Sequence, residues 1–320
     1  MAENRENCFR TSIGGQALIE GILMRGPKKT EIAVRMSDGT ISTEEMSTTF
    51  IKDKHSIMRL PLLRGIAGFI DSLSVGYKAL SYSVDKAGLE EDEEPSKFDK
   101  WVEKTFGDKM MNVIMVASTV LGLLLAVGLF FFLPTIIFNL IRDYAAGPSI
   151  APWRSLVEGV MRIAIFIAYI YFCSRMPEIH RLFQYHGAEH KTIFCYENNE
   201  ELTVENVRKH SRFHPRCGTS FLVIMLILGI IVGFFIPFGN PFVRTIVKIL
   251  CIPIIVGVGY EFIRLCGRCD NTATRIISAP GLWVQRITTK EPDDSMIEVA
   301  IEAMKRVIPE NGEDKIKIGD

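Results

Sequence analysis

Residues 111–141 read MNVIMVASTVLGLLLAVGLFFFLPTIIFNLI, an apolar run without a single charged side chain. A helix needs about 20 such residues to cross the hydrocarbon core of a bilayer. Three further apolar runs follow along the chain, at Leu156–Cys173, Phe221–Phe238 and Ile246–Ile263. The sequence therefore predicts a mainly α, polytopic helical membrane protein with about four transmembrane helices, and the lipid bilayer is its first expected partner.

The distribution of Lys and Arg predicts the orientation, because basic residues concentrate in short cytoplasmic loops. The connection from Arg175 to Arg216 is rich in them, whereas the turn around Gly239 offers only Arg244. We therefore expect a multi-pass protein of the plasma membrane with this connection and both termini in the cytoplasm. Overall charge gives no argument for nucleic-acid binding, since 37 basic residues balance 37 acidic ones.

Smaller elements are expected around the spans. Ser37-Asp38-Gly39-Thr40 lies between two β-capable runs and predicts a hairpin, whereas the glycines from Gly14 to Pro27 favour a buried turn. Ala279–Trp283 indicates another turn, and Asp293 begins an amphipathic helix. The predicted division is an N-terminal cytoplasmic β-containing region (1–58), an amphipathic or interfacial helix (59–84), an acidic linker (85–110), a first transmembrane pair (111–177), a cytoplasmic His-rich loop (178–218), a second transmembrane pair (219–265) and a C-terminal cytoplasmic region (266–320).

The most distinctive polar segment of the chain is His186-Gly187-Ala188-Glu189-His190. On a helix the two histidines share one face and Glu189 lies beside them. The order H-x-x-E-H is that of inverted zinc peptidases, in which both histidines bind zinc and the glutamate activates a water molecule. The alternative is a structural helix whose histidines and glutamate only form hydrogen bonds with their neighbours.

Further ligands could come from elsewhere in the chain. Five of the six histidines lie between His180 and His214, and Cys217 follows closely. Either His214 or Cys217 could approach the His186/His190 face, although His214 could instead mark a loop that binds lipid headgroups. Glu261 is a second candidate, because a carboxylate near the end of a membrane helix usually binds a cation or pairs with a base. Its alternative is an ion pair with Arg264 or Arg268.

Cysteine usage favours reduced thiols. The seven cysteines are an odd number, and several lie in apolar stretches or in predicted cytoplasmic loops. Cys266 and Cys269 have a redox or zinc spacing and could join Cys217 in a structural site, but a single such pair is weak evidence, and two adjacent thiols without a shared role are the preferred interpretation. In the N-terminal region, Glu20 and Arg25 are charged residues within an apolar run, which favours a mutual ion pair or a functional role.

Four motifs together resemble the YqhQ-type family of bacterial membrane proteins. They are Gly14 to Pro27 (GGQALIEGILMRGP), His186 to Thr192 (HGAEHKT), Arg216 to Ser220 (RCGTS) and Thr289 to Met296 (TKEPDDSM). The resemblance runs from about residue 12 to about residue 305. It implies a multi-span inner-membrane protein with a suspected metal site and no established substrate. Carried over residue by residue, it singles out Gln16, Glu20, Arg25, His186, Glu189, His190 and Cys217.

The leading hypothesis is a metal-dependent hydrolase at the cytoplasmic membrane surface. His186 and His190 would bind a divalent metal ion, zinc by preference, with Glu189 as general base and Glu261 or His214 completing the ligands. Its substrate would contain a peptide bond or a lipid ester. Two alternatives remain: a non-enzymatic factor that assists the insertion, assembly or quality control of other membrane proteins, and a small-solute or ion transporter that uses Glu261 and Glu158.

Overall fold

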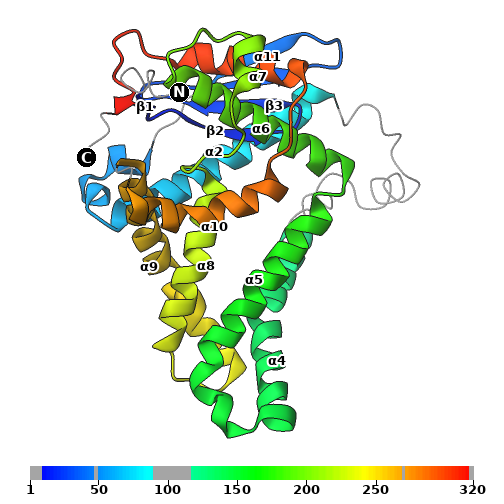
Figure 1. The fold of residues 1–320 in the computed structure, drawn as a ribbon, viewed down its shortest axis with the longest axis vertical. Coiled ribbons are helices and arrows are strands. Elements are labelled where there is room, and N and C mark those ends of the chain that lie inside the picture. The colour runs from blue at the N-terminus through cyan, green and yellow to red at the C-terminus, as the bar shows by residue number, and fades with distance from the viewer. Residues whose placement is uncertain (1–8, 47–49, 89–116, 269–270, 317–320) are drawn as a thin grey trace. The chain divides into compact units, whose positions relative to one another are not determined.

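The structure is a computed structural model that describes residues 9–46, 50–88, 117–268 and 271–316. It is mostly helical, with a small N-terminal β region (Figure 1). The chain divides into two compact units. Unit 1 comprises Met1–Gly88, Ile170–Met225 and Pro253–Asp320, and unit 2 comprises Leu89–Tyr169 and Leu226–Ile252. The predicted acidic linker lies almost wholly outside the described residues.

A four-stranded antiparallel sheet forms the β region of unit 1. Its strands, in spatial order, are β2 (Gly14–Leu18), β3 (Gly21–Arg25), β4 (Thr30–Arg35) and β5 (Ile41–Glu45). The predicted hairpin is confirmed, because β4 and β5 pair across the turn and Gly39 adopts a φ of 83° there. The buried turn expected between Gly14 and Pro27 is wrong. That segment forms the β2–β3 hairpin, because its apolar side chains can be buried on both faces of the sheet.

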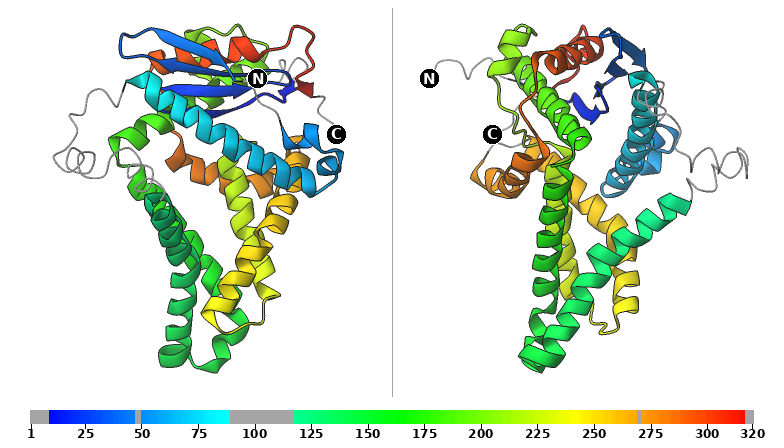
Figure 2. Two further views of the ribbon diagram at one scale, coloured as in Figure 1. Left: turned by 180° about the vertical axis from the view of Figure 1, so that it is seen from behind. Right: turned by 90° about the vertical axis from the view of Figure 1, so that its right-hand side faces the viewer.

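Each face of the sheet has its own hydrophobic core, because successive side chains of a strand point to opposite faces. Ile22 and Met24 of β3 pack with residues of α6 (Pro177–Glu197) and α11 (Asp294–Val307). Leu23, between them, packs on the other side with residues of α2 (Leu63–Ala87). Figure 2 shows the sheet between α2 and the pair α6 and α11. The helices predicted near 59–84 and after Asp293 are therefore present, with Asp293 as the N-cap of α11.

Helix α10 (Thr272–Thr288) replaces the turn that was expected at Ala279–Trp283. An Asn271/Thr274 capping box starts the helix, and Pro280 lies inside it. Its buried residues recur at helical spacing, from Thr274 through Ser278 to Thr288. Burial of that face outweighs the loss of one backbone hydrogen bond at proline. The remaining elements of unit 1 are β1 (Arg10–Thr11), which pairs with β6 (Lys315–Ile316), α1 (Ile51–Lys54), η1 (Ser56–Arg59) and α7 (Val204–Lys209).

Three described helices are long and apolar enough to cross a membrane: Ala117–Ala146, Pro148–Cys173 and Pro241–Leu265. A fourth apolar helix, α8 (Gly218–Phe234), is shorter at 17 residues. A membrane protein with three or four spans fits these helices, and its orientation stays a prediction. The elements in these regions are η2 (Gly128–Phe132), α4 (Leu133–Ile141), η3 (Arg142–Ala146), η4 (Pro148–Trp153), α5 (Arg154–Cys173) and α9 (Pro241–Arg268).

Unit 2 contains a buried cluster of charges. The Glu158 carboxylate of α5 accepts hydrogen bonds from Arg154 at 2.8 Å and from Arg244 at 3.2 Å, and a third from Lys248. Glu158 is 1% exposed and Arg244 is 2% exposed. A carboxylate with three basic partners is fully engaged, so the role of Glu158 that the structure supports is to stabilise unit 2.

Candidate metal centre

Helix α6 brings the three polar residues of the H-x-x-E-H motif to one face. Positions i, i+3 and i+4 are neighbours on a helix, and the rings of His186 and His190 lie 4.4 Å apart between their centroids. The rest of this turn is buried against the sheet and α11, through Tyr185 and Ala188. The predicted shared face is therefore present, inside unit 1 and next to its main core.

Backbone carbonyls orient both imidazoles. His186 Nδ1 lies 2.8 Å from the carbonyl oxygen of Thr288, and His190 Nδ1 lies 2.6 Å from that of Arg212. A carbonyl only accepts hydrogen bonds, so each Nδ1 must carry a proton and donate it. In a neutral imidazole the Nε2 atom then keeps its lone pair. This is the arrangement that metal-binding histidines commonly show, with the second nitrogen held by a carbonyl.

Cys217, just before α8, supplies a third ligand atom. Its Sγ lies 3.1 Å from His186 Nε2, and the possible ligand atoms of His186, His190 and Cys217 all lie within 4.8 Å of one another. A tetrahedral zinc ion with ordinary bond lengths separates nitrogen and sulfur ligands by about 3.5 Å. Binding would need only a small outward movement of the thiol, so these three residues suit a zinc ion with one open position.

The protonation of this cluster is set by mutual electrostatics. Burial disfavours charge on His186, but the neighbouring Cys217 thiolate outweighs it and raises the pKa of His186 to about 9. Burial likewise disfavours the thiolate, yet His186 and His190 hold the pKa of Cys217 well below its ordinary value. Without a metal ion, His186 and Cys217 therefore form an imidazolium–thiolate pair, and the thiolate is the form of cysteine that binds metals.

A second group, Cys195, Glu200 and His210, also has its possible ligand atoms within 4.8 Å of one another. Burial raises the pKa of Cys195 to about 11, so its thiol stays protonated. His210 is engaged with the Glu200 carboxylate at 3.2 Å. This group is a weaker metal site than the first one, because it offers a neutral thiol where metal binding requires a thiolate.

Glu189 is buried beside the cluster and is held by the N-terminal sheet. Its Oε1 accepts a hydrogen bond from the backbone N–H of Gly15 in β2, at 3.1 Å. A Cβ at position 15 would lie 2.9 Å from Cγ of Glu189, so only glycine allows this approach. Burial raises the pKa of Glu189, which suits a carboxylate that takes up and releases protons. Gly15 lies in the N-terminal motif, but no sequence pattern indicates that its backbone N–H contacts Glu189.

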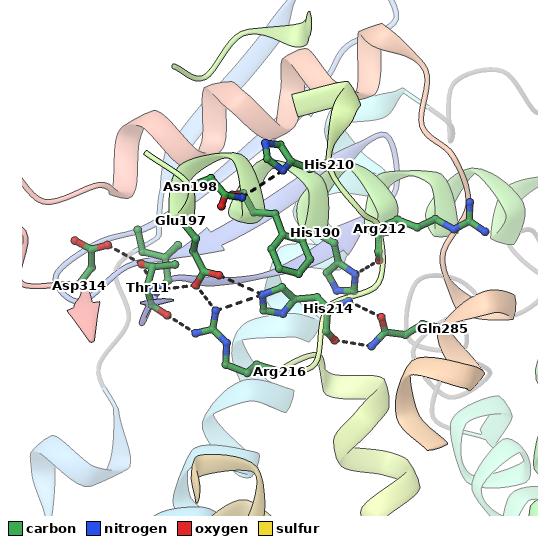
Figure 3. Close-up of polar contacts among 12 residues, drawn as sticks. Thr11, His190, Glu197, Asn198, His210, Arg212, His214, Arg216, Gln285 and Asp314 are labelled. Carbon is green, nitrogen blue, oxygen red and sulfur yellow. Dashed lines mark hydrogen bonds and ion pairs between the residues drawn. The ribbon is translucent and has the colours of Figure 1, made fainter. Parts of the chain in front are cut away.

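His214 belongs to the network that holds the loop before α8, drawn in Figure 3. Its ring lies 5.4 Å from that of His190, but its Nε2 faces Arg216 at 3.3 Å. The side-chain oxygen of Gln285 accepts a hydrogen bond from the backbone N–H of His214 at 2.8 Å. The side-chain nitrogen of Gln285 donates to the backbone carbonyl oxygen of His214 at 2.7 Å. Burial lowers the pKa of His214 to about 4, so the ring is neutral. His214 is therefore not part of the group whose possible ligand atoms converge, whereas Cys217, which follows on the same loop, belongs to it.

Arg216 fixes the other end of this loop, as Figure 3 also shows. Its guanidinium donates to the carbonyl oxygen of Thr11 at 2.6 Å and forms an ion pair with Glu197 at the end of α6. The Glu197 carboxylate also accepts the N–H of Thr11 at 2.7 Å. Cys217 is therefore carried by a loop that is anchored on both β1 and α6.

Glu261 does not reach the cluster. Its carboxylate forms a two-point ion pair with Arg64 of α2, with one contact at 2.6 Å. The predicted role as third ligand is therefore not supported. The alternative was an ion pair with Arg264 or Arg268. The described ion-pair partner is Arg64, and the side chain of Arg268 lies outside the described residues. The side chains of Cys266 and Cys269 lie outside the described residues, so their proposed zinc site is untested.

The N-terminal candidates lie around the sheet and not in the cluster. Glu20 forms an ion pair with Arg181 of α6 and accepts a hydrogen bond from the Tyr185 hydroxyl, in place of the expected pair with Arg25. The guanidinium of Arg25 lies 3.9 Å above the ring of Phe50. The amide of Gln16 lies directly against Gly76 of α2. Glu20 and Gln16 therefore join the sheet to its covering helices, and Arg25 contacts the segment just before α1.

Comparisons with known proteins agree with the resemblance noted in the sequence. Residues 60–310 match the family described as "Protein of unknown function (DUF1385)". The chain is 34% identical over 296 residues to the "Uncharacterized protein YqhQ" of Bacillus subtilis (strain 168), covering 92% of each chain. No solved structure matches the chain. The chain belongs to the DUF1385 family, whose function is unknown.

Proposed function

We propose that this protein is a metal-dependent hydrolase whose centre consists of His186, His190 and Cys217, with zinc as the preferred ion. One observation carries the proposal: both histidines donate Nδ1–H to backbone carbonyls while the possible ligand atoms of all three residues converge. Three protein ligands with a position left for water or substrate are the usual composition of a catalytic zinc site. Structural zinc sites usually have four protein ligands.

Each residue has a distinct role in the proposed reaction. A divalent ion held by the three ligands would supply Lewis acidity. Glu189 is held at Oε1 by Gly15, so Oε2 is the atom that accepts the proton of the attacking water. The water oxygen bonds to the carbonyl carbon of the substrate, the bond to the leaving group breaks, and Glu189 returns the proton to the leaving nitrogen or oxygen.

The two alternatives to a hydrolase receive less support. A transporter was expected to use Glu158 and Glu261, and both carboxylates are engaged by basic side chains. The hypothesis of a factor that assists other membrane proteins does not explain why two oriented imidazoles lie beside a thiolate. The substrate classes that we propose, a peptide bond or a lipid ester near the membrane surface, fit the apolar helices of the same chain.

Elemental analysis of the detergent-purified protein tests the metal centre. The wild-type protein is expected to hold about one metal ion per chain, and His190→Ala should reduce this to background, because one of three ligands is lost. His55→Ala is the matched control, since His55 is exposed and lies outside the cluster. Circular dichroism confirms that each variant is folded. Absence of metal from the wild-type protein, even after reloading under reducing conditions, would refute the centre.

Glu189→Gln tests the catalytic step separately from metal binding. The amide cannot accept the proton, so turnover of a hydrolysable ester or peptide is expected to fall about 10²- to 10⁴-fold. Metal content should stay at the wild-type level, because Glu189 is not one of the three ligands. The substrate is first found by screening ester and peptide panels with the metal-loaded protein. Metal loss in this variant would make Glu189 a ligand and contradict its role as base.

The affinity for zinc is expected to rise with pH between about pH 7 and pH 9. In the metal-free protein His186 is protonated below its raised pKa of about 9, and zinc must displace that proton. Apparent affinity should therefore increase by about tenfold for each pH unit and become constant above pH 9. Competition with a chromophoric chelator, corrected for its own protonation, measures this profile. A flat profile over the same range would show that His186 is neutral before the metal binds.

A further inference from the structure

Unit 1 contains a pocket outside the metal centre. It encloses about 350 Å³, within the range of about 300–1,000 Å³ that is usual for small-molecule sites. Its lining residues come from the end of α5, the start of α6 and the end of α10 with the segment that follows. They are Tyr171, Ser174, Arg175, His180, Arg286, Ile287 and Lys290.

The lining carries positive charge and no acidic side chain. Arg175, Arg286 and Lys290 are basic side chains, and His180 adds an imidazole. Within the described part of the chain, none of these four has a carboxylate within 4.0 Å. Other arginines of unit 1 do have such partners, as in Arg181 with Glu20. Like charges that converge without a counter-charge repel one another, and a bound anion removes that cost.

One of these cations is also held in place. The guanidinium of Arg175 hydrogen-bonds to the hydroxyl of Tyr171 and lies 4.8 Å from the centroid of its ring. Neither contact neutralises the charge, so Arg175 is oriented and remains available to an anion. Arginine binds phosphate through two parallel N–H groups, and lysine adds a compact point charge. The combination at this pocket suits a phosphate group.

The pocket lies where a candidate membrane span ends. The span Pro148–Cys173 finishes between Tyr171 and Ser174, and both residues line the pocket. Tyrosine and basic side chains at such a position are typical of the headgroup region of a bilayer. The phosphates of membrane lipids are therefore the phosphate groups nearest to this site, although a soluble phosphate would meet the same chemistry.

We propose that this pocket binds a phosphate group, carried by a phospholipid headgroup or by a soluble phosphate. This second step rests on the proposed function: the pocket would also select the substrate, because the pocket and the metal centre are both built on α6 and on the end of α10 with the segment that follows. Lys290 donates its backbone N–H to Phe183 of α6 at 2.8 Å, and Thr288 holds His186. His180 precedes His186 by six residues on the same helix, or about 9 Å along its axis. A phosphate-bearing lipid ester is the substrate class that follows.

Thermal unfolding of the detergent-purified full chain tests the binding site. Mixed micelles of dodecylmaltoside with phosphatidylglycerol are compared with micelles containing diacylglycerol, which has the same chains and no phosphate. Inorganic phosphate is compared with chloride at equal ionic strength. Phosphatidylglycerol at a hundredfold excess over its Kd should raise the Tm of the wild-type protein by about 5 °C, because it binds the folded state.

The Arg286→Gln/Lys290→Gln variant removes two cations of the pocket and should lose this shift. The Lys209→Gln/Lys305→Gln variant is the matched control, since it removes two exposed cations elsewhere in unit 1 and should keep the shift. If the first variant does not fold, Arg175→Gln replaces it. Metal content, measured on the same samples, keeps the two proposals separate: loss of the lipid shift with metal retained concerns the pocket alone.

Each outcome decides the proposal. A pocket-dependent shift with phosphatidylglycerol alone assigns the site to a lipid headgroup, and a shift with inorganic phosphate as well assigns it to phosphate from either source. Equal shifts with diacylglycerol, equal shifts in the pocket variant and its control, or no shift at all would each overturn the proposal.

Discussion

Gly187→Ala is expected to destabilise unit 1 and to weaken metal binding. A Cβ at position 187 would lie 2.0 Å from the carbonyl oxygen of Lys290, which is a backbone atom and cannot rotate away. Either α6 or the segment after α10 must therefore move. That segment is tied to α6 by the Lys290–Phe183 hydrogen bond and by a second bond from Gln184 to the carbonyl of Glu291, at 3.0 Å.

The cost of this substitution follows from overpacking. In an ordinary helix, alanine in place of glycine stabilises by roughly 0.5–1 kcal/mol. Here the overlap should reverse the sign and lower the free energy of unfolding by about 2–3 kcal/mol. Displacement of Thr288 would also loosen His186, so metal affinity should fall about 10- to 100-fold, as for other groups that orient a ligand. Denaturant unfolding and chelator competition measure the two effects.

Gly68→Ala is the matched control for this prediction. Gly68 also lies inside a helix, α2, but the nearest atom to its added Cβ is 3.9 Å away, an ordinary contact. This variant should be as stable as the wild-type protein or slightly more so, and its metal affinity should not change. Equal behaviour of the two glycine variants would contradict the close approach of α6 to Lys290.

Glu158→Gln is expected to destabilise unit 2 by about 3–5 kcal/mol, because it leaves buried cations without their carboxylate. Arg244 and Lys248 both form ion pairs with Glu158, and neither side chain has appreciable contact with solvent. Arg162 is a further buried cation on α5, and its Nη2 has no hydrogen-bond partner among the described residues. Thermal unfolding in detergent or bicelles measures the loss.

Two further variants test the cause. Adding Lys248→Met to Glu158→Gln removes one of the unpaired cations and should recover part of the stability, because an apolar side chain needs no counter-charge. Glu205→Gln breaks an exposed ion pair between Glu205 and Lys209 and should cost less than about 0.5 kcal/mol. A double variant that is less stable than Glu158→Gln alone would show that Lys248 contributes through packing and not through its charge.

The elements that could be predicted from sequence are those whose signal is local. The apolar runs, the hairpin at Gly39 and the helix after Asp293 each depend on residues within one short window. The prediction of a turn at Ala279–Trp283 was wrong, because burial of one face of α10 outweighs the low helix propensity of a proline and a glycine. The β2–β3 hairpin was not predicted for the same reason: burial outweighs the local preference of its glycines for a turn. Local preferences are weak compared with the burial of a whole face.

In the candidate metal centre, too, some features follow from local sequence and others only from the tertiary structure. The shared face of His186, Glu189 and His190 follows from helical spacing, so the sequence by itself determined it. Only the tertiary structure shows that Cys217, and not His214 or Glu261, lies beside the two histidines with its candidate ligand atom, because loop closure brings distant residues together without a sequence period. The carbonyl groups that orient the histidines had no sequence signal at all, since every residue has the same backbone. Packing of α6 against its neighbours selected which of those groups meet the imidazoles.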